Sequence, residues 1–227
     1  MCGGKAGLWP GMDLKERAES GMLLLMILHP HRRLWLMVAL CLAIAARVSA
    51  DTLEDYAAKI APLVDPVRLA TLAEKAANPR VQKYTVWLEM ARRDGVNPTN
   101  VVEAALRAVG MTNKLAAEVT RTVMLRNLKI ATELACFDEA GVNDMRQGQS
   151  PTIRRGPYQG QQLTVDHIIP RARAPELDNL IANLELLPWE LNLKKGTKFG
   201  QRQRDLTRKL FAAGLLSQEV WKRLRVL

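Results

Sequence analysis

Two dipeptides in which a capping residue precedes proline constrain this chain most, because each marks the start of a helix. They are Asp65-Pro66 and Asn97-Pro98. The short polar side chain caps the first turn, and proline is tolerated at the first helical position, where its missing N–H is not needed. Around these starts, apolar residues recur at steps of three and four. We therefore expect a mainly α protein with an N-terminal bundle of helices over residues 51–137.

A second part of the chain begins at about residue 138, where glycine, proline, glutamine and arginine become frequent and helical periodicity stops. The segment 161–169 (QQLTVDHII) has the β-branched, partly alternating pattern of a strand, and residues 184–187 (LELL) can form a second one. A loop over 170–182 joins them, and Pro188 opens a short helix. Two further helices follow, one ending near Gly214 and one starting near Ser217. The expected order in residues 138–227 is therefore strand, loop, strand, helix.

Residues 1–50 carry the features of a signal peptide. HPHRR is followed by the apolar run LWLMVALCLAIAA and then by RVSA, whose small residues suit signal peptidase. The run is shorter than the about 20 residues of a membrane span, so we expect cleavage after Ala50, with a retained signal anchor as the alternative. Later methionines, such as Met22 and Met37, offer alternative starts. The predicted location is secreted or periplasmic, without stable membrane association after cleavage.

Cysteine usage limits the covalent chemistry of the mature chain. After removal of residues 1–50 only Cys136 remains, so neither an internal disulfide nor a cysteine-built zinc site can form. Cys136 lies in the apolar run LACF and is expected to be a small buried side chain.

Positive charge is concentrated at the C-terminal end. Residues 190–227 hold ten basic and three acidic side chains, whereas residues 51–189 hold seventeen of each. Such asymmetry indicates a polyanionic partner, with phosphate backbones the first candidate. A solvated helical face would give the same count, and charge alone does not decide between the two.

Three short segments after residue 160 together resemble the HNH, or His-Me finger, endonuclease family. They are VDHIIPRA, NLELLP and LNLKKG, over about residues 154–198. The resemblance implies a ββα-metal finger, in which Asp166 and His167 end the first strand, Asn183 precedes the second strand and Asn192 lies in the helix. The chain departs from many members in having asparagine at the last motif position and in lacking the paired cysteines that hold a structural zinc.

The resemblance and elementary chemistry assign the same roles. Phosphodiester hydrolysis needs an activated water and a cation that stabilises the developing charge. Carboxylate and amide oxygens suit Mg²⁺, or alternatively Mn²⁺, so Asp166 and Asn192 are the predicted metal ligands. His167, the only histidine after Ala50, is the predicted general base. Adjacent strand residues point to opposite faces, which separates these two tasks. The resemblance gives Asn183 the role of tying down the loop, although an ordinary turn asparagine would look the same.

Basic residues near the motif are the predicted phosphate contacts, with a solvated helix end as the alternative. Trp189 and Tyr158 have the rings to stack on bases, but we expect Trp189 to be buried. The predicted nucleic-acid contacts are Arg171, Arg173, Lys194, Lys195, Lys198, Arg202 and Arg204.

We therefore predict an exported, divalent-metal-dependent HNH endonuclease that hydrolyses nucleic acid, DNA in preference to RNA. No small-molecule cofactor is expected, and the sequence does not indicate an oligomeric state. One alternative is a non-catalytic nucleic-acid-binding protein on a decayed HNH finger. Another is an envelope protein whose basic end docks acidic polymers. Decay would be expected to strike Asp166, His167 or Asn192 early, and all three are present.

Overall fold

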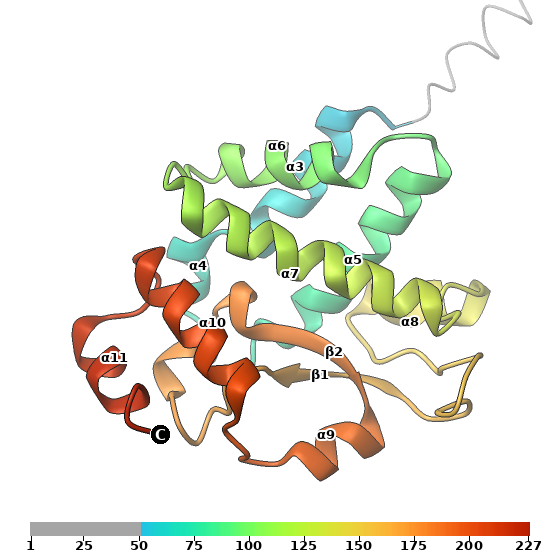
Figure 1. Ribbon diagram of the computed structural model, residues 1–227. Coiled ribbons are helices and arrows are strands. Elements are labelled where there is room, and N and C mark those ends of the chain that lie inside the picture. Colours follow the sequence, from blue (N-terminus) through green and yellow to red (C-terminus); the bar gives the residue numbers. More distant parts are fainter. Residues whose placement is uncertain (1–50) are drawn as a thin grey trace, which may run out of the picture. The chain divides into compact units, whose positions relative to one another are not determined.

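Side-chain caps begin most of the helices in the N-terminal half, as the capping dipeptides predict. In the computed structural model, which describes residues 51–227, the Asp65 carboxylate accepts the N–H groups of Val67 and Arg68, and the Asn97 amide accepts that of Thr99. The prediction of a mainly helical protein is confirmed (Figure 1). The helices up to the strands are α3 (Leu53–Val64), α4 (Pro66–Ala70), α5 (Asn78–Arg93), α6 (Pro98–Ala108), α7 (Lys114–Glu133) and α8 (Glu139–Gln147).

The expectation that helical structure stops at about residue 138 is wrong, because Asp138 caps helix α8 over Glu139–Gln147. After α8 the chain has the expected order of strand, loop, strand and helix. Strand β1 (Leu163–His167) pairs antiparallel with β2 (Leu184–Pro188), and the loop between them contains the short 3-10 turns η1 (Pro175–Leu177) and η2 (Ile181–Asn183). Helix α9 (Trp189–Lys195) follows β2 directly, and α10 (Gln201–Ala212) and α11 (Gln218–Leu224) come after it. The sequence pattern thus located both strands and the three helices that follow them.

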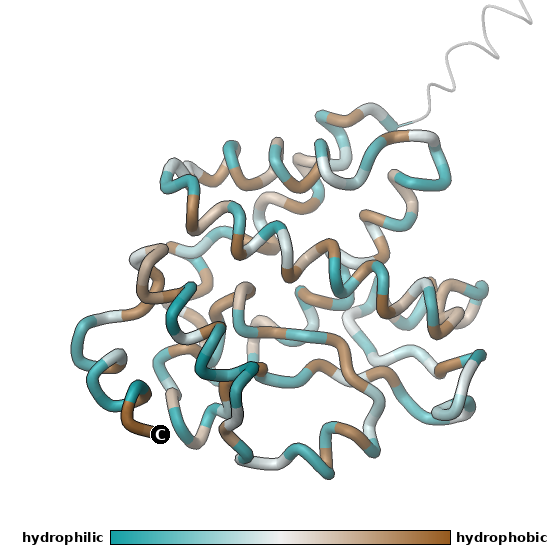
Figure 2. Tube along the Cα trace, viewed as in Figure 1, coloured by the Kyte–Doolittle hydropathy of each residue, from teal (hydrophilic) through white to brown (hydrophobic). Residues whose placement is uncertain are grey.

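The strand pair lies between two sets of helices. Helices α5 and α7 pack on it from one side and α9 contacts both strands (Figure 1). Leu163, Leu184 and Leu186 are buried in the same hydrophobic core as residues of α3, α5, α6 and α7. Figure 2 shows β2 as largely hydrophobic and α10 as largely hydrophilic. The strands are therefore fixed by the helical half of the chain.

Two buried amides from the helices hold the strand backbones. The Asn127 side chain of α7 donates to the Leu184 carbonyl (3.0 Å) and accepts the Leu186 N–H (2.9 Å). The Gln82 side chain of α5 donates to the Leu163 carbonyl (3.1 Å). Because hydrogen bonds are directional, they fix the position of the strands along the helices, which hydrophobic packing alone does not specify.

The predicted boundary at residues 137/138 marks a change in local structure rather than a division between two packing units. Residues Asp51–Leu227 form one compact unit, because the strands after residue 138 share their core with helices before it. The expectation that Cys136 is buried is confirmed, and burial raises the pKa of its thiol to about 12. The signal-peptide prediction falls on residues 1–50, which lie outside the described part of the chain. No helix in residues 51–227 is both long and apolar enough to cross a membrane.

Candidate functional site

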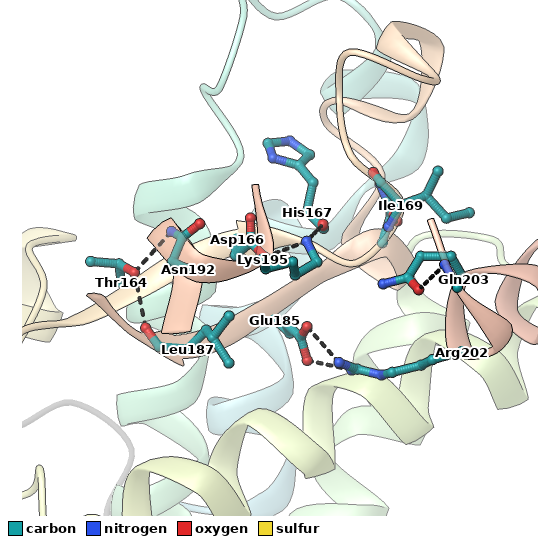
Figure 3. Close-up of polar contacts among 12 residues, drawn as sticks. Thr164, Asp166, His167, Ile169, Glu185, Leu187, Asn192, Lys195, Arg202 and Gln203 are labelled. Atoms are coloured by element: carbon teal, nitrogen blue, oxygen red, sulfur yellow. Dashed lines mark hydrogen bonds and ion pairs between the residues drawn. The ribbon is translucent and has the colours of Figure 1, made fainter. Parts of the chain in front are cut away.

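One face of β1 carries the predicted metal ligand Asp166 toward α9. Thr164 and Asp166 are two positions apart on the strand and so share a face. Asn192 of α9 donates its side-chain N–H to Thr164 Oγ1 at 3.1 Å, which places it over that same face (Figure 3). Because the amide nitrogen makes this bond, the amide oxygen is left as an acceptor. The strand and the helix thus bring the predicted metal ligands Asp166 and Asn192 together.

A cation from the chain itself lies at this face. The ammonium of Lys195, in the last turn of α9, forms an ion pair with the Asp166 carboxylate and donates to the backbone carbonyl of His167 (Figure 3). Both side chains are largely buried, Lys195 at 14% exposed and Asp166 at 13%. The prediction that Lys195 lies free for a phosphate therefore differs from its observed position.

Glu185 is a second carboxylate of the site that the motif did not reveal. It pairs with Asp166 across the antiparallel register and is fully buried. Arg202 of α10 binds it in a bidentate manner, with Nη1 2.8 Å from Oε1, and Arg126 Nη2 of α7 lies 3.8 Å from Oε2. Its place beside Asp166 follows from the register of the two strands, which the structure defines. Arg202 is thus committed to Glu185 and ties α10 to the strand pair.

His167 lies on the other side of β1, and its ring points away from Asn192 and Lys195 in Figure 3. Its Nε2 is 3.0 Å from the Asp178 carbonyl oxygen and 2.9 Å from Asp178 Oδ1. Both atoms are acceptors only, so Nε2 carries the hydrogen and Nδ1 carries the lone pair. Within residues 51–227, Nδ1 makes no hydrogen bond. The ring is therefore held in the tautomer in which Nδ1 can accept a proton.

Asn183 fixes the loop that surrounds His167. Its buried side chain accepts the Ile169 N–H at 2.7 Å and donates to the Ile169 carbonyl at 3.1 Å and to the Leu177 carbonyl at 3.4 Å. A turn asparagine bonds mainly to its own neighbours, whereas this one bridges backbone fourteen residues away. The contacts match the loop-tying role that the resemblance implies for this position.

The loop that carries Asp178 is also clamped by the segment between α4 and α5. The Lys75 N–H donates to Asp178 Oδ2 at 2.8 Å, and the Ala77 N–H donates to the Asn179 side chain at 3.0 Å. Asn179 in turn donates to the carbonyls of Leu72 (3.3 Å) and Ala73 (3.0 Å). Lys75 adopts a φ of 58°, a left-handed conformation that is strained for a residue with a side chain. The helical half therefore takes part in shaping the site.

The predicted phosphate contacts fall into two groups. Arg171 pairs with Glu74, Lys194 with Glu190 and Lys195 with Asp166, and Arg202 binds Glu185. Arg173, Lys198 and Arg204 form no ion pair within residues 51–227, and the Arg204 guanidinium donates instead to Gln201 and to the Leu227 carbonyl. The second group is the one whose charge is available to a polyanion.

The expected burial of Trp189 is wrong. Its side chain is 53% exposed, and Leu193, one turn further along α9, is also exposed. Helix α9 is short and packs on the strands through its other face, so these two apolar side chains are left at the surface beside Asn192.

The donor set fits a hard divalent cation in its chemistry. It consists of the Asp166 carboxylate, the Asn192 amide oxygen and the His167 carbonyl, all oxygen ligands of the kind that Mg²⁺ prefers. The Lys195 ammonium already uses two of these oxygens, which shows that the position accepts a cation. The part of the chain in the structure holds no cluster of three or more His, Cys, Asp or Glu side chains able to bind a metal. A metal here would keep several waters.

Comparisons of the chain with protein-family models, with curated proteins and with solved structures found no match.

Proposed function

We propose that this protein is a divalent-metal-dependent endonuclease of the HNH type, which hydrolyses phosphodiester bonds in nucleic acid and prefers DNA to RNA. The observation that carries the proposal is the arrangement around the end of β1. Asp166 and Asn192 lie on one face with side-chain oxygens, and the His167 ring on the other face is held through Nε2 by Asp178. Asn183 fixes the loop between them.

This arrangement divides the chemistry between two groups. His167 takes a proton from the attacking water through Nδ1, while its Nε2–H stays bound to Asp178. Asp166 and Asn192 would hold the Mg²⁺ or Mn²⁺ that stabilises charge on the phosphate and on the leaving oxygen. For both to act on one phosphate, the substrate must lie across the carboxyl-terminal end of β1, where the strand ends at His167.

Nucleic acid is supported as the substrate by two features of the surface near β1. The excess positive charge of the described chain lies in residues 190–227, next to the site in sequence. The exposed Trp189 offers a ring for stacking on a base, with Leu193 beside it. Charge supplies affinity for any sequence, and stacking is tolerant of base identity, so we expect little sequence preference.

A second candidate is a non-catalytic nucleic-acid-binding protein built on the same finger. It is favoured by the ion pair of Lys195 with Asp166 and by the direction of the His167 ring. Nicking of supercoiled plasmid by the full chain, with Mg²⁺ or Mn²⁺ and with EDTA, separates the two. Nicking that EDTA abolishes supports the nuclease, and binding without nicking supports the alternative.

Replacement of the base gives the sharpest test of the proposal. His167→Ala should lower the nicking rate by about two to four powers of ten, the usual contribution of a positioned general base. DNA binding should be retained, because the phosphate contacts are untouched. Gln159→Ala, an exposed loop variant, serves as the control. Folded His167→Ala protein that nicks as fast as the control would rule out the proposed base.

A further inference from the structure

Lys194 and Lys195 are consecutive but lie in opposite environments. Lys194 is 68% exposed and pairs with Glu190 one turn earlier on α9. Lys195 is inserted toward β1, where it touches the Asp166 carboxylate and the His167 carbonyl. A lysine in the last turn of a helix gains from the helix dipole without leaving water. The insertion of Lys195 therefore needs a specific cause.

That cause is the carboxylate of Asp166. Burying an ammonium or a carboxylate away from water costs free energy unless the two groups pair with each other. Removal of either one leaves an uncompensated buried charge. The backbone carbonyl of His167 completes the site by accepting a second hydrogen from the ammonium. The Lys195 ammonium thus lies between the two oxygens that would bind a divalent cation under the proposed function.

We propose that Lys195 is an exchangeable internal cation, which yields Asp166 to a divalent metal and then binds the phosphate of the substrate. This inference rests on the proposed function for its second step. One carboxylate cannot neutralise both an ammonium and a doubly charged ion, so Lys195 is repelled once the position is taken. A bound phosphodiester then replaces Asp166 as the negatively charged partner of the ammonium.

The local structure permits this exchange without a rearrangement of the fold. Lysine has a flexible four-carbon stem and a compact charge that binds phosphate well. Lys195 is the last residue of α9, and Gly196 follows with a φ of 50°. The residues that follow it, 196–198, are exposed, so the end of the helix next to Lys195 borders on solvent.

Mn²⁺ binding to the full chain, measured by electron paramagnetic resonance without nucleic acid, tests the first step. Lys195→Met removes the charge and keeps an unbranched side chain one atom shorter, so Mn²⁺ should bind about tenfold tighter or more than to the unmodified chain. Lys194→Met, the adjacent exposed lysine, is the matched control and should leave the affinity unchanged. Equal affinities in these two variants would overturn the inference.

A second variant keeps the test decisive if Lys195→Met fails to fold. Lys195→Arg retains the charge and offers a fork that binds a carboxylate in a bidentate manner, so Mn²⁺ should bind more weakly than to the unmodified chain. Binding that is tighter or unchanged would contradict exchange. Asp166→Asn in the Lys195→Met background should remove the gain in affinity, since Asp166 is the proposed ligand.

The second step has a readout in turnover. At saturating Mn²⁺ Lys195→Met should nick plasmid more slowly than Lys129→Met, an exposed lysine of α7, because no ammonium is left at position 195 to bind the phosphate. Equal rates would overturn this step. Failure of the inference and of the proposed function are distinguishable. Metal-dependent nicking with unchanged Mn²⁺ affinities rejects the exchange alone, and tighter Mn²⁺ binding without any nicking rejects the nuclease alone.

Discussion

Asp178 shows how a single residue can hold an imidazole and also compensate its charge. Its backbone carbonyl accepts the hydrogen from His167 Nε2, and its Oδ1 lies 2.9 Å from the same nitrogen. Oδ1 is buried and makes no hydrogen bond within residues 51–227, while Oδ2 is fixed by the Lys75 N–H. The hydrogen on Nε2 is given to the backbone carbonyl of the same residue. When Nδ1 takes a proton, the carboxylate beside the ring stabilises the positive charge of the imidazolium.

Asp178→Asn therefore tests a positioning role for this residue. The substitution keeps the size and the backbone carbonyl but removes the charge, so the imidazolium formed during reaction loses its counter-ion. We expect the nicking rate to fall by about ten- to a hundredfold, a typical effect of a partner behind a site residue. Mn²⁺ affinity and DNA binding should be unchanged. Asp144→Asn on α8 is the control, and an equal rate in the two variants would count against the role.

The sequence identified some site residues and missed others for a clear physical reason. Asp166, His167, Asn183 and Asn192 could be proposed from the sequence because their order follows local elements that a pattern can reveal. Asp178 and Glu185 were missed, since their roles depend on pairing across a loop and across the strand register. The ion pair of Lys195 with Asp166 was missed because a lysine at a helix end is normally in solvent.

At the scale of elements, the hydrogen bonds between residues 72–77 and the loop residues Asp178 and Asn179 form a clamp that holds the site loop in place. Within this clamp, the Asn179 side chain makes three hydrogen bonds, to the backbone of Ala77, Leu72 and Ala73. Each contributes about 0.5–1.5 kcal/mol net, so Asn179→Ala should lower the free energy of unfolding by about 2 kcal/mol, measured in urea. The exposed Asn143→Ala on α8 should change it by less than about 0.5 kcal/mol.

The same variant separates local order from global stability. Amide hydrogen exchange in residues 170–182 should rise in Asn179→Ala, because the loop loses its anchor while the strand pair keeps its core. Exchange that rises equally throughout the chain would instead indicate that the clamp serves only overall stability.

Strands and helices were more predictable than the contacts between them. Capping pairs and apolar periodicity are local signals, and they located α4 and α6 as well as β1 and β2. The clamp joins residues about a hundred positions apart, and no local pattern marks such a pair. Sequence therefore gave the order of the elements, whereas their packing into one unit across residue 138 required the structure.

For the whole molecule, the uneven charge predicts how binding responds to salt. Arg202 and Arg208 are engaged by Glu185 and Asp205, so they should contribute little to binding of DNA. Lys198, Arg204 and Lys209 form no ion pair within residues 51–227. Their joint replacement by glutamine should lower the slope of log affinity against log salt by about one for each lost phosphate contact.

The control for this prediction is an equal loss of charge in the helical half. Replacement of Arg68, Lys114 and Lys129 by glutamine should leave the slope nearly unchanged, because residues 51–189 carry balanced charge. Binding measured by fluorescence anisotropy on a short duplex gives the slope directly. Equal reductions in the two triple variants would assign the effect to net charge rather than to a surface.

The amides of Asn127 and Gln82 have a consequence for solubility. A sheet of only two strands leaves a row of unpaired backbone groups along each outer edge, and such edges recruit strands from other chains. Asn127 contacts Leu184 and Leu186 as a third strand would, and Gln82 occupies the Leu163 carbonyl on the other strand. Helical side chains thus satisfy part of each outer edge from within the molecule. These bonds reduce the number of unpaired backbone groups that the strands offer to neighbouring copies as a template for aggregation.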